Sequence, residues 1–243
     1  MAAGRIIEDW VDEATRKALG DLAYGALDSD EYAVRERLVG SAVGAFYLGK
    51  TRSPGRFHVV SAVEDFDNFA AGVVRKLEDD GALVRYSCVW PQRQIINKEL
   101  LREVSPIYQA FRQERWESPY QLIFAVSNIG TVARIKSCIV HTAIDEGLDN
   151  GDFLDILSGS CHESVRPRLS ASLPRSLADR FRVFSPAKDF GIDNDGFSEP
   201  GVGGNPAIRS GIGTGLQREY FIPLTVRDDF HLEAPATKYD GGT

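Results

Sequence analysis

The stretch that decides the fold is FHVVSAVEDFDNFAAGVVRKLEDD, residues 57–80. Its apolar first part, Phe57–Val63, predicts a buried strand. From Asp67 onward, apolar residues recur every three or four positions and Gly81 follows the last of them, which predicts a helix. The stretch therefore predicts one strand–helix unit of an α/β protein, and its junction carries three acidic residues: Glu64, Asp65 and Asp67.

Similar units follow along the chain. Apolar runs predict strands over 82–90 and 120–127, and helical periodicity predicts helices over 97–116 and 130–146. We expect the first of these helices to be kinked or broken at Pro106. Three strand–helix steps in succession predict a mostly parallel sheet flanked by helices.

The two ends of the chain have a different texture. Residues 1–50 predict an N-terminal helical segment, with one helix beginning near Ile6 and a second whose N-cap is Ser29 or Asp30. Residues 51–230 would then form the α/β domain and 231–243 a flexible tail. In the last third we expect short helices over 152–160 and 173–180, strands over 180–185 and 217–226, and a long glycine-rich loop over 187–215.

The bulk composition limits the function classes. The chain has 243 residues, of which 43% are hydrophobic and 26% charged, as expected of a globular protein with a sizeable core. A net charge of −7 argues against nucleic acid bound through the overall field, which leaves only a local arginine cluster within 166–182. Without a long apolar run or a secretory signal, we expect no membrane association and a cytoplasmic location.

The acids at the first strand end suggest a metal site. Alternation along an extended strand would put Asp65 and Asp67 on the same side. Mg²⁺ prefers one or two carboxylates together with phosphate oxygens, so we predict Mg²⁺ on Asp65 and Asp67, with Asp65 and Glu64 as catalytic groups. The alternative is that Asp67 caps its own helix while Glu64 and Asp65 are simply solvated.

The end of the 120–127 strand suggests a phosphate site. A helix N-terminus, a glycine and two hydroxyls meet there, and we predict that Ser127, Gly130 and Thr131 bind phosphate. Arg209, in the glycine-rich stretch, would close over the anion as part of a lid. Two alternatives stay open: Ser127 or Asn128 is a plain N-cap, and the glycine-rich stretch is an arm that orders on a protein partner.

Two family resemblances involve the acidic stretch. VEDFDNFAAG, residues 63–72, resembles the acidic pair of phosphoribosyltransferases at Glu64 and Asp65. That family would continue with a Thr-Gly loop holding the sugar phosphate, whereas Asn68–Ala71 stands here. DFDN, residues 65–68, resembles the opening of PIN-like nucleases, which need further acids that 124–131 lacks. Each resemblance is confined to one short stretch, so neither assigns a family.

Cysteine and histidine spacing adds little chemistry. The three cysteines show no CxxC pair and the four histidines no metal-binding spacing, so we expect neither a disulfide framework nor zinc. Cys161 is a candidate nucleophile, although free cysteines are more often buried and inert.

Two functional hypotheses follow. The first is a protein that binds a nucleotide or a phosphorylated small molecule, with Mg²⁺-dependent catalysis left open. The second is a non-catalytic subunit of a larger assembly, which would use the N-terminal helices, the glycine-rich loop and the tail as contacts with protein partners.

Overall fold

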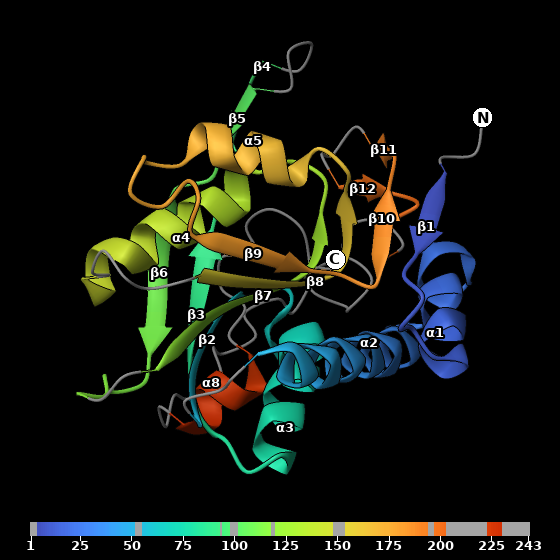
Figure 1. Cartoon of the computed structure of the whole chain (residues 1–243), viewed down its shortest axis with the longest axis horizontal. Coiled ribbons are helices and arrows are strands. Elements are labelled where there is room, and N and C mark those ends of the chain that lie inside the picture. The colour runs from blue at the N-terminus through green and yellow to red at the C-terminus, as the bar shows by residue number, and fades with distance from the viewer. Residues whose placement is uncertain are drawn as a thin grey trace, which may run out of the picture.

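The computed structural model describes residues 4–51, 55–92, 94–97, 102–117, 120–147, 154–193, 197–202 and 223–229. Within these residues the main feature is an eight-stranded sheet (Figure 1). Its strands, in spatial order, are β1 (Arg5–Ile7), β10 (Ala187–Asp189), β8 (Leu154–His162), β7 (Gln121–Ile129), β2 (Arg56–Ala62), β3 (Leu83–Pro91) and β6 (Ile107–Arg112), with β9 (Phe181–Phe184) also pairing with β8.

The centre of this sheet is parallel. Strands β3, β2, β7, β8 and the consecutive pair β9 and β10 all run the same way, whereas β6 and β1 are antiparallel at the two edges. This confirms the predicted α/β class with a mostly parallel sheet. Counted in chain order, the parallel strands are arranged 2-1-3-4-5, so the direction of winding reverses between β2 and β7.

Helices cover both faces, which explains why β2 and β7 are apolar along nearly their whole length. One face carries α1 (Glu13–Tyr24), α2 (Ser29–Lys50), the π-helix η1 (Phe66–Ala70) and α3 (Ala71–Asp79); the other carries α4 (Ala133–Glu146) and α5 (Val165–Ser172) (Figure 1). Successive residues of β2 feed the two cores, Val59 on the α2 side and Val60 on the α4 side.

Two glycines allow α2 to cross closely over η1 and α3. A Cβ at Gly40 would collide with the carbonyl oxygen of Phe69, and one at Gly72 would collide with that of Arg37. This contact holds η1 directly beneath the acidic turn that follows β2.

The N-terminal helical segment is present as α1 and α2, but its first residues form β1 and not the expected helix. Arg5 binds Asp189 through two hydrogen bonds of 2.7 and 3.1 Å, which fixes β1 against β10. α1 begins after Asp12, whose carboxylate accepts from the Thr15 amide at 2.6 Å, and it continues through Gly20. α2 begins after Asp28, one residue earlier than predicted.

The helix expected over 97–116 is wrong. In its place are β4 (Gln94–Asn97) and β5 (Arg102–Val104), which form a hairpin projecting beyond the end of β3, and then the edge strand β6 (Figure 1). Pro106 separates β5 from β6, and a proline is incompatible with a helix interior. The short helix expected over 152–160 is also wrong, because this apolar run is β8 and is buried on both faces.

The glycine-rich stretch is only partly described. Residues 187–189 form β10, and the hairpin β11 (Gly191–Ile192) and β12 (Ser198–Glu199) follows, so a loop over the whole of 187–215 is wrong for this part. Residues 194–196 and 203–215 of that stretch, the tail 231–243 and most of the final strand expected over 217–226 lie outside the described residues. Of that strand, Leu224–Val226 belong instead to a helix, α8 (Leu224–Asp229).

No helix in the described part of the chain has the length and apolar character required to cross a bilayer.

Candidate functional site at the carboxyl edge of the sheet

The two segments singled out in the sequence meet in space. Parallel strands end at the same edge of a sheet, and β2 and β7 are neighbours, so the residues near their carboxyl ends are adjacent. The Ser127 hydroxyl donates a 2.6 Å hydrogen bond to Asp65 Oδ1, and both residues are buried. This contact lies where the strand order reverses, the position at which open α/β sheets usually bind their ligands.

An arginine that the sequence reading missed supplies the cation of this cluster. Arg134, in the first turn of α4, forms an ion pair with Glu64 and donates to the Asn128 carbonyl at 3.1 Å. Arg134 Nη2, which donates to Asn128, also lies 3.9 Å from Asp65 Oδ2. One guanidinium therefore faces two buried carboxylates.

The charges of the cluster are unevenly balanced. Burial raises the pKa of Asp65, and the neighbouring Glu64 adds to this, while Arg134 and the Ser127 hydroxyl act in the opposite direction. Asp65 Oδ2 accepts no hydrogen bond from any described residue. Asp65 therefore holds a proton more readily than an ordinary aspartate does.

A further acid lies on the α2 side. Glu36 is buried and accepts a 2.9 Å hydrogen bond from the Tyr32 hydroxyl. Burial raises its pKa well above the ordinary value, and the charge of Asp65 raises it further. The carboxylates at this edge thus outnumber the arginine.

Asp67 has a different partner from Asp65. Its carboxylate accepts from the Leu224 amide at 2.8 Å and the Thr225 hydroxyl at 3.0 Å, so it caps α8 and not its own helix (Figure 1 shows α8 beside α3). Residues 63–65 form a turn and 66–70 a π-helix, so the strand alternation that would pair Asp65 with Asp67 does not apply.

This donor arrangement does not fit a resident Mg²⁺. Glu64 is paired with Arg134, Asp65 with Ser127, and Asp67 with α8. Across the described ranges, no three His, Cys, Asp or Glu side chains are grouped as metal ligands.

Neither Ser127 nor Asn128 caps the helix that follows the predicted phosphate loop. Ser127 and Asn128 lie within β7, and α4 begins after Val132, which gives it no side-chain cap. Gly130 is buried and Thr131 is half-buried at the rim. The first-turn amides of α4 therefore lack a side-chain acceptor at the cap position, which is the arrangement that binds anions. Arg209 lies outside the described residues.

The segment 197–202 covers this edge. Asn128 Oδ1 accepts from the Ser198 amide at 2.8 Å and from its hydroxyl at 2.9 Å, and the Ser198 hydroxyl lies 3.2 Å from that of Ser160. The Phe197 ring lies 5.7 Å from the Arg134 guanidinium. Gly201 has a φ of +60° and leaves no room for a Cβ beside Asn128, so this covering segment needs glycine there.

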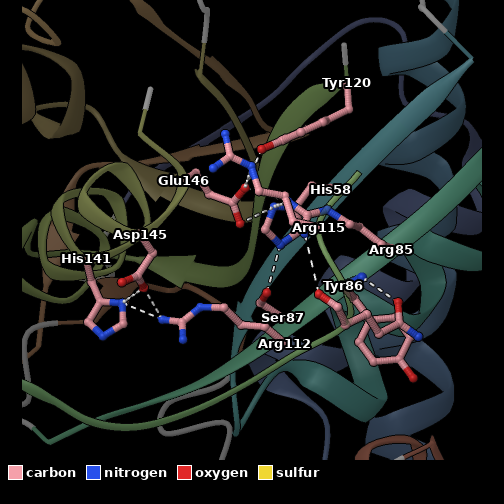
Figure 2. A network of polar contacts seen from close by, with 11 residues as sticks. His58, Arg85, Tyr86, Ser87, Arg112, Arg115, Tyr120, His141, Asp145 and Glu146 are labelled. Carbon is pink, nitrogen blue, oxygen red and sulfur yellow. Dashed lines mark hydrogen bonds and ion pairs between the residues drawn. The ribbon is translucent and has the colours of Figure 1, made fainter. Parts of the chain in front are cut away.

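A second buried polar network lies at the opposite, amino edge of the sheet (Figure 2). Arg85 Nη2 donates to His58 Nδ1 at 3.0 Å and to Glu146 at 2.6 Å, and the Tyr120 hydroxyl also donates to Glu146. His58 Nε2 lies 2.8 Å from the Ser87 hydroxyl. The network joins the starts of β2 and β3 to the end of α4.

His58 in this network is a neutral structural residue. Burial lowers its pKa well below the ordinary value, and the charges of Arg85 and Arg112 lower it further. Because Nδ1 accepts from Arg85, Nε2 carries the hydrogen and donates to Ser87. The sequence reading missed this network, since its members are brought together only by the strand order.

The remaining sequence candidates carry little chemistry. Burial raises the pKa of Cys161 to about 11, so the thiol is not a ready nucleophile. In the arginine cluster, Arg182 binds Asp155 through two hydrogen bonds of 2.7 Å and Arg180 donates to the Ser176 carbonyl. Arg180 and Arg182 are therefore engaged with separate partners.

Fold and site together define an open α/β protein with a buried polar cluster at the switch point of its sheet. The AQ2163 protein from Aquifex aeolicus shares this fold, with a TM-score of 0.60 and 11% identity over 86% of this chain and 100% of AQ2163. A hypothetical protein from Neisseria gonorrhoeae with bound ppGpp has a TM-score of 0.39 at 9% identity, covering 65% of this chain and 82% of its own. The hypoxanthine-guanine phosphoribosyl transferase of L. donovani has a TM-score of 0.35 at 10% identity, covering 69% of this chain and 82% of its own. No family model and no curated protein matches the sequence.

Proposed function

We propose that this protein binds a nucleotide or a phosphorylated small molecule at the carboxyl edge between β2 and β7. The observation that carries the proposal is the 2.6 Å hydrogen bond from Ser127 to Asp65, which joins the two strand-end segments at the switch point. Ligands of open α/β sheets bind in this position because helix N-termini and loops converge there.

The neighbouring groups are suited to a phosphate. The first-turn amides of α4 point their hydrogens away from the helix body, and the positive end of the helix favours an anion. Gly130 and the Thr131 hydroxyl lie on the approach to that turn. Arg134 would exchange its contact with Glu64 for a phosphate oxygen, and Arg209 would add a second cation.

Asp65 and Glu64 would supply acid–base chemistry if the bound molecule reacts. A carboxyl group with a raised pKa transfers protons more effectively near neutral pH than an ordinary aspartate. When a phosphate draws Arg134 away, Glu64 loses its counter-charge and a proton on Asp65 or Glu64 becomes more favourable. We assign no Mg²⁺ to the site, because both carboxylates predicted as its ligands already have partners: Asp65 accepts from Ser127 and Asp67 caps α8.

A thermal-shift screen tests this function. Nucleoside mono-, di- and triphosphates should raise the melting temperature of the wild type, and Arg134→Gln should abolish the shift. Lys17→Gln, which removes one exposed charge from α1, is the matched control and should shift like wild type. No shift with any phosphorylated compound, or equal shifts in Arg134→Gln and wild type, would refute the proposal. Mg²⁺ alone should produce no shift.

A second candidate function is a non-catalytic subunit. It is favoured by the burial of the polar cluster at the switch point. Glu64, Asp65 and Asn128 are each at most 2% exposed beneath the segment 197–202. In addition, α2 presents Val34 and Leu38 one turn apart, and they are 50% and 40% exposed. Sedimentation of the wild type and of Val34→Lys tests this candidate. A concentration-dependent assembly that the lysine abolishes supports it, and a monomer at all concentrations counts against it.

A further inference from the structure

A separate pocket of about 380 Å³ lies between the start of α5 and the ends of β8 and β10. Its volume is within the range of small-molecule sites, roughly 300–1,000 Å³. The side chains that define its chemistry are Glu8, Glu163, Arg166 and Lys188, with Val165 and Val183 as apolar walls.

This pocket is separate from the buried polar cluster between β2 and β7. Adjacent residues of a strand point to opposite faces of the sheet. Ser160 contacts Ser198, which covers the polar cluster. Cys161, the next residue, packs with the core beneath α4 and α5 and lines the pocket. A ligand in the pocket would therefore touch none of the residues that we assign to the phosphate site.

The charged residues of the pocket include both signs. Two cations, Arg166 and Lys188, and two carboxylates, Glu8 and Glu163, face one space, yet none of the four forms an ion pair with another described side chain. A simple anion would be repelled by the two carboxylates, and a simple cation by the two basic groups. A molecule that carries both charges satisfies all four.

His162 adds a ring N–H donor. Its Nδ1 accepts from the Ser164 amide at 3.1 Å, so in the neutral ring the hydrogen is on Nε2. The Ser164 hydroxyl lies 2.8 Å from the same Nδ1. The ring is therefore held in one orientation at the mouth of the pocket and can donate to a carboxylate oxygen.

We propose that this pocket binds a zwitterionic amino acid with an aliphatic side chain. Arg166 and Lys188 hold its carboxylate, Glu8 and Glu163 hold its ammonium group, and its side chain packs against Val165 and Val183. The proposal concerns binding alone, because the Cys161 thiol in the pocket wall is neutral.

Calorimetric titration with three matched probes tests the ligand class. L-leucine carries both charges, 4-methylpentanoate lacks the ammonium group, and 3-methylbutylamine lacks the carboxylate. We expect L-leucine to bind and each analogue to bind at least about tenfold more weakly, since each lacks one set of charge-assisted hydrogen bonds. Equal binding of an analogue, or no binding of L-leucine, overturns the proposal.

Variants of the full chain locate the site. Arg166→Gln and Glu163→Gln should each weaken L-leucine binding about tenfold. Arg168→Gln, on the same helix but outside the pocket, should bind like wild type. Asp65→Asn should also bind L-leucine like wild type, which separates this proposal from the phosphate site. Unchanged affinity in both Arg166→Gln and Glu163→Gln would overturn it.

Discussion

The two edges of the sheet carry buried polar clusters of opposite balance. At the amino edge, the Glu146 carboxylate accepts hydrogen bonds from Arg85 and Tyr120, and Arg115 lies 3.6 Å from it (Figure 2). At the carboxyl edge, Glu64 and Asp65 share Arg134. Excess donors around one acid stabilise a fold, whereas excess acid around one base leaves groups available for a ligand or a proton. We therefore propose a structural role for the cluster at the amino edge and a ligand-binding role for the cluster at the carboxyl edge.

The largest expected effect is at the amino edge. Glu146→Ala leaves the buried Arg85 without its carboxylate, and we expect a loss of about 3–5 kcal/mol in the free energy of unfolding. Urea denaturation measures this loss. The control is Asp145→Ala, whose ion pair with Arg112 is partly exposed and should cost at most about 1 kcal/mol. Equal effects of the two variants would contradict a structural role for the network.

An intermediate effect is expected in the covering segment. Gly201→Ala places a Cβ at a φ of +60° and against Asn128, so we expect a loss of about 1–3 kcal/mol. Amide hydrogen exchange should show faster exchange at Ser198 in this variant, because its bond to Asn128 is released. Gly20→Ala, at a position in α1 with open space around it, should not destabilise the protein. A neutral Gly201→Ala would show that the segment is not held as described.

At the carboxyl edge we expect a substitution to raise the free energy of unfolding, where those above lower it. Burial disfavours the charged form of Asp65, so Asp65→Asn should stabilise the protein at pH 7, by about 1 kcal/mol as for typical single stabilising substitutions. In the proposed site Asp65 transfers protons and does not bind the phosphate, so the same variant should bind a nucleoside phosphate at least as tightly as the wild type. Urea denaturation checks the first expectation. If Asp65→Asn instead lowers the free energy of unfolding, Asp65 has a structural role like that of Glu146.

The smallest effect is in the pH dependence of stability. Burial raises the pKa of Glu36 well above its ordinary value of 4.5, so above that pH the folded protein binds more protons than the unfolded chain. Its contribution to stability therefore falls as pH rises from about 4.5 toward the folded pKa. Glu36→Gln should remove this fall, measured as the free energy of unfolding between pH 5 and pH 8. His58, with a lowered pKa, contributes the opposite slope below its ordinary value of 6.5 in both proteins.

The first strand–helix unit could be predicted because its signals are local. The apolar run of β2, the periodicity of α3 and the run of β7 followed by α4 lie within short windows of sequence. β8 could not be told from a short helix, since a continuous apolar run has no period. The strand over 107–112 was missed because its polar and apolar residues also fit a helical repeat.

The meeting of the two strand-end segments could be predicted from the sequence, whereas the other residues of the cluster could not. Asp65 and Ser127 were singled out because both follow strands, and parallel pairing brings them together. Arg134 and Glu36 were missed because the acids beside them in the fold, Glu64 and Asp65, lie far away in sequence. Asp67 was misread for the same reason, since the helix it caps begins at Leu224.

The central claim is that the carboxyl edge at β2 and β7 binds a phosphorylated ligand through Arg134. The most direct test is the equilibrium dissociation constant of a nucleoside phosphate, measured by calorimetry for the wild type, Arg134→Gln and Lys17→Gln. We expect Arg134→Gln to bind at least about tenfold more weakly and Lys17→Gln to bind like wild type. Equal constants for the wild type and Arg134→Gln, or no binding by the wild type, would contradict the account.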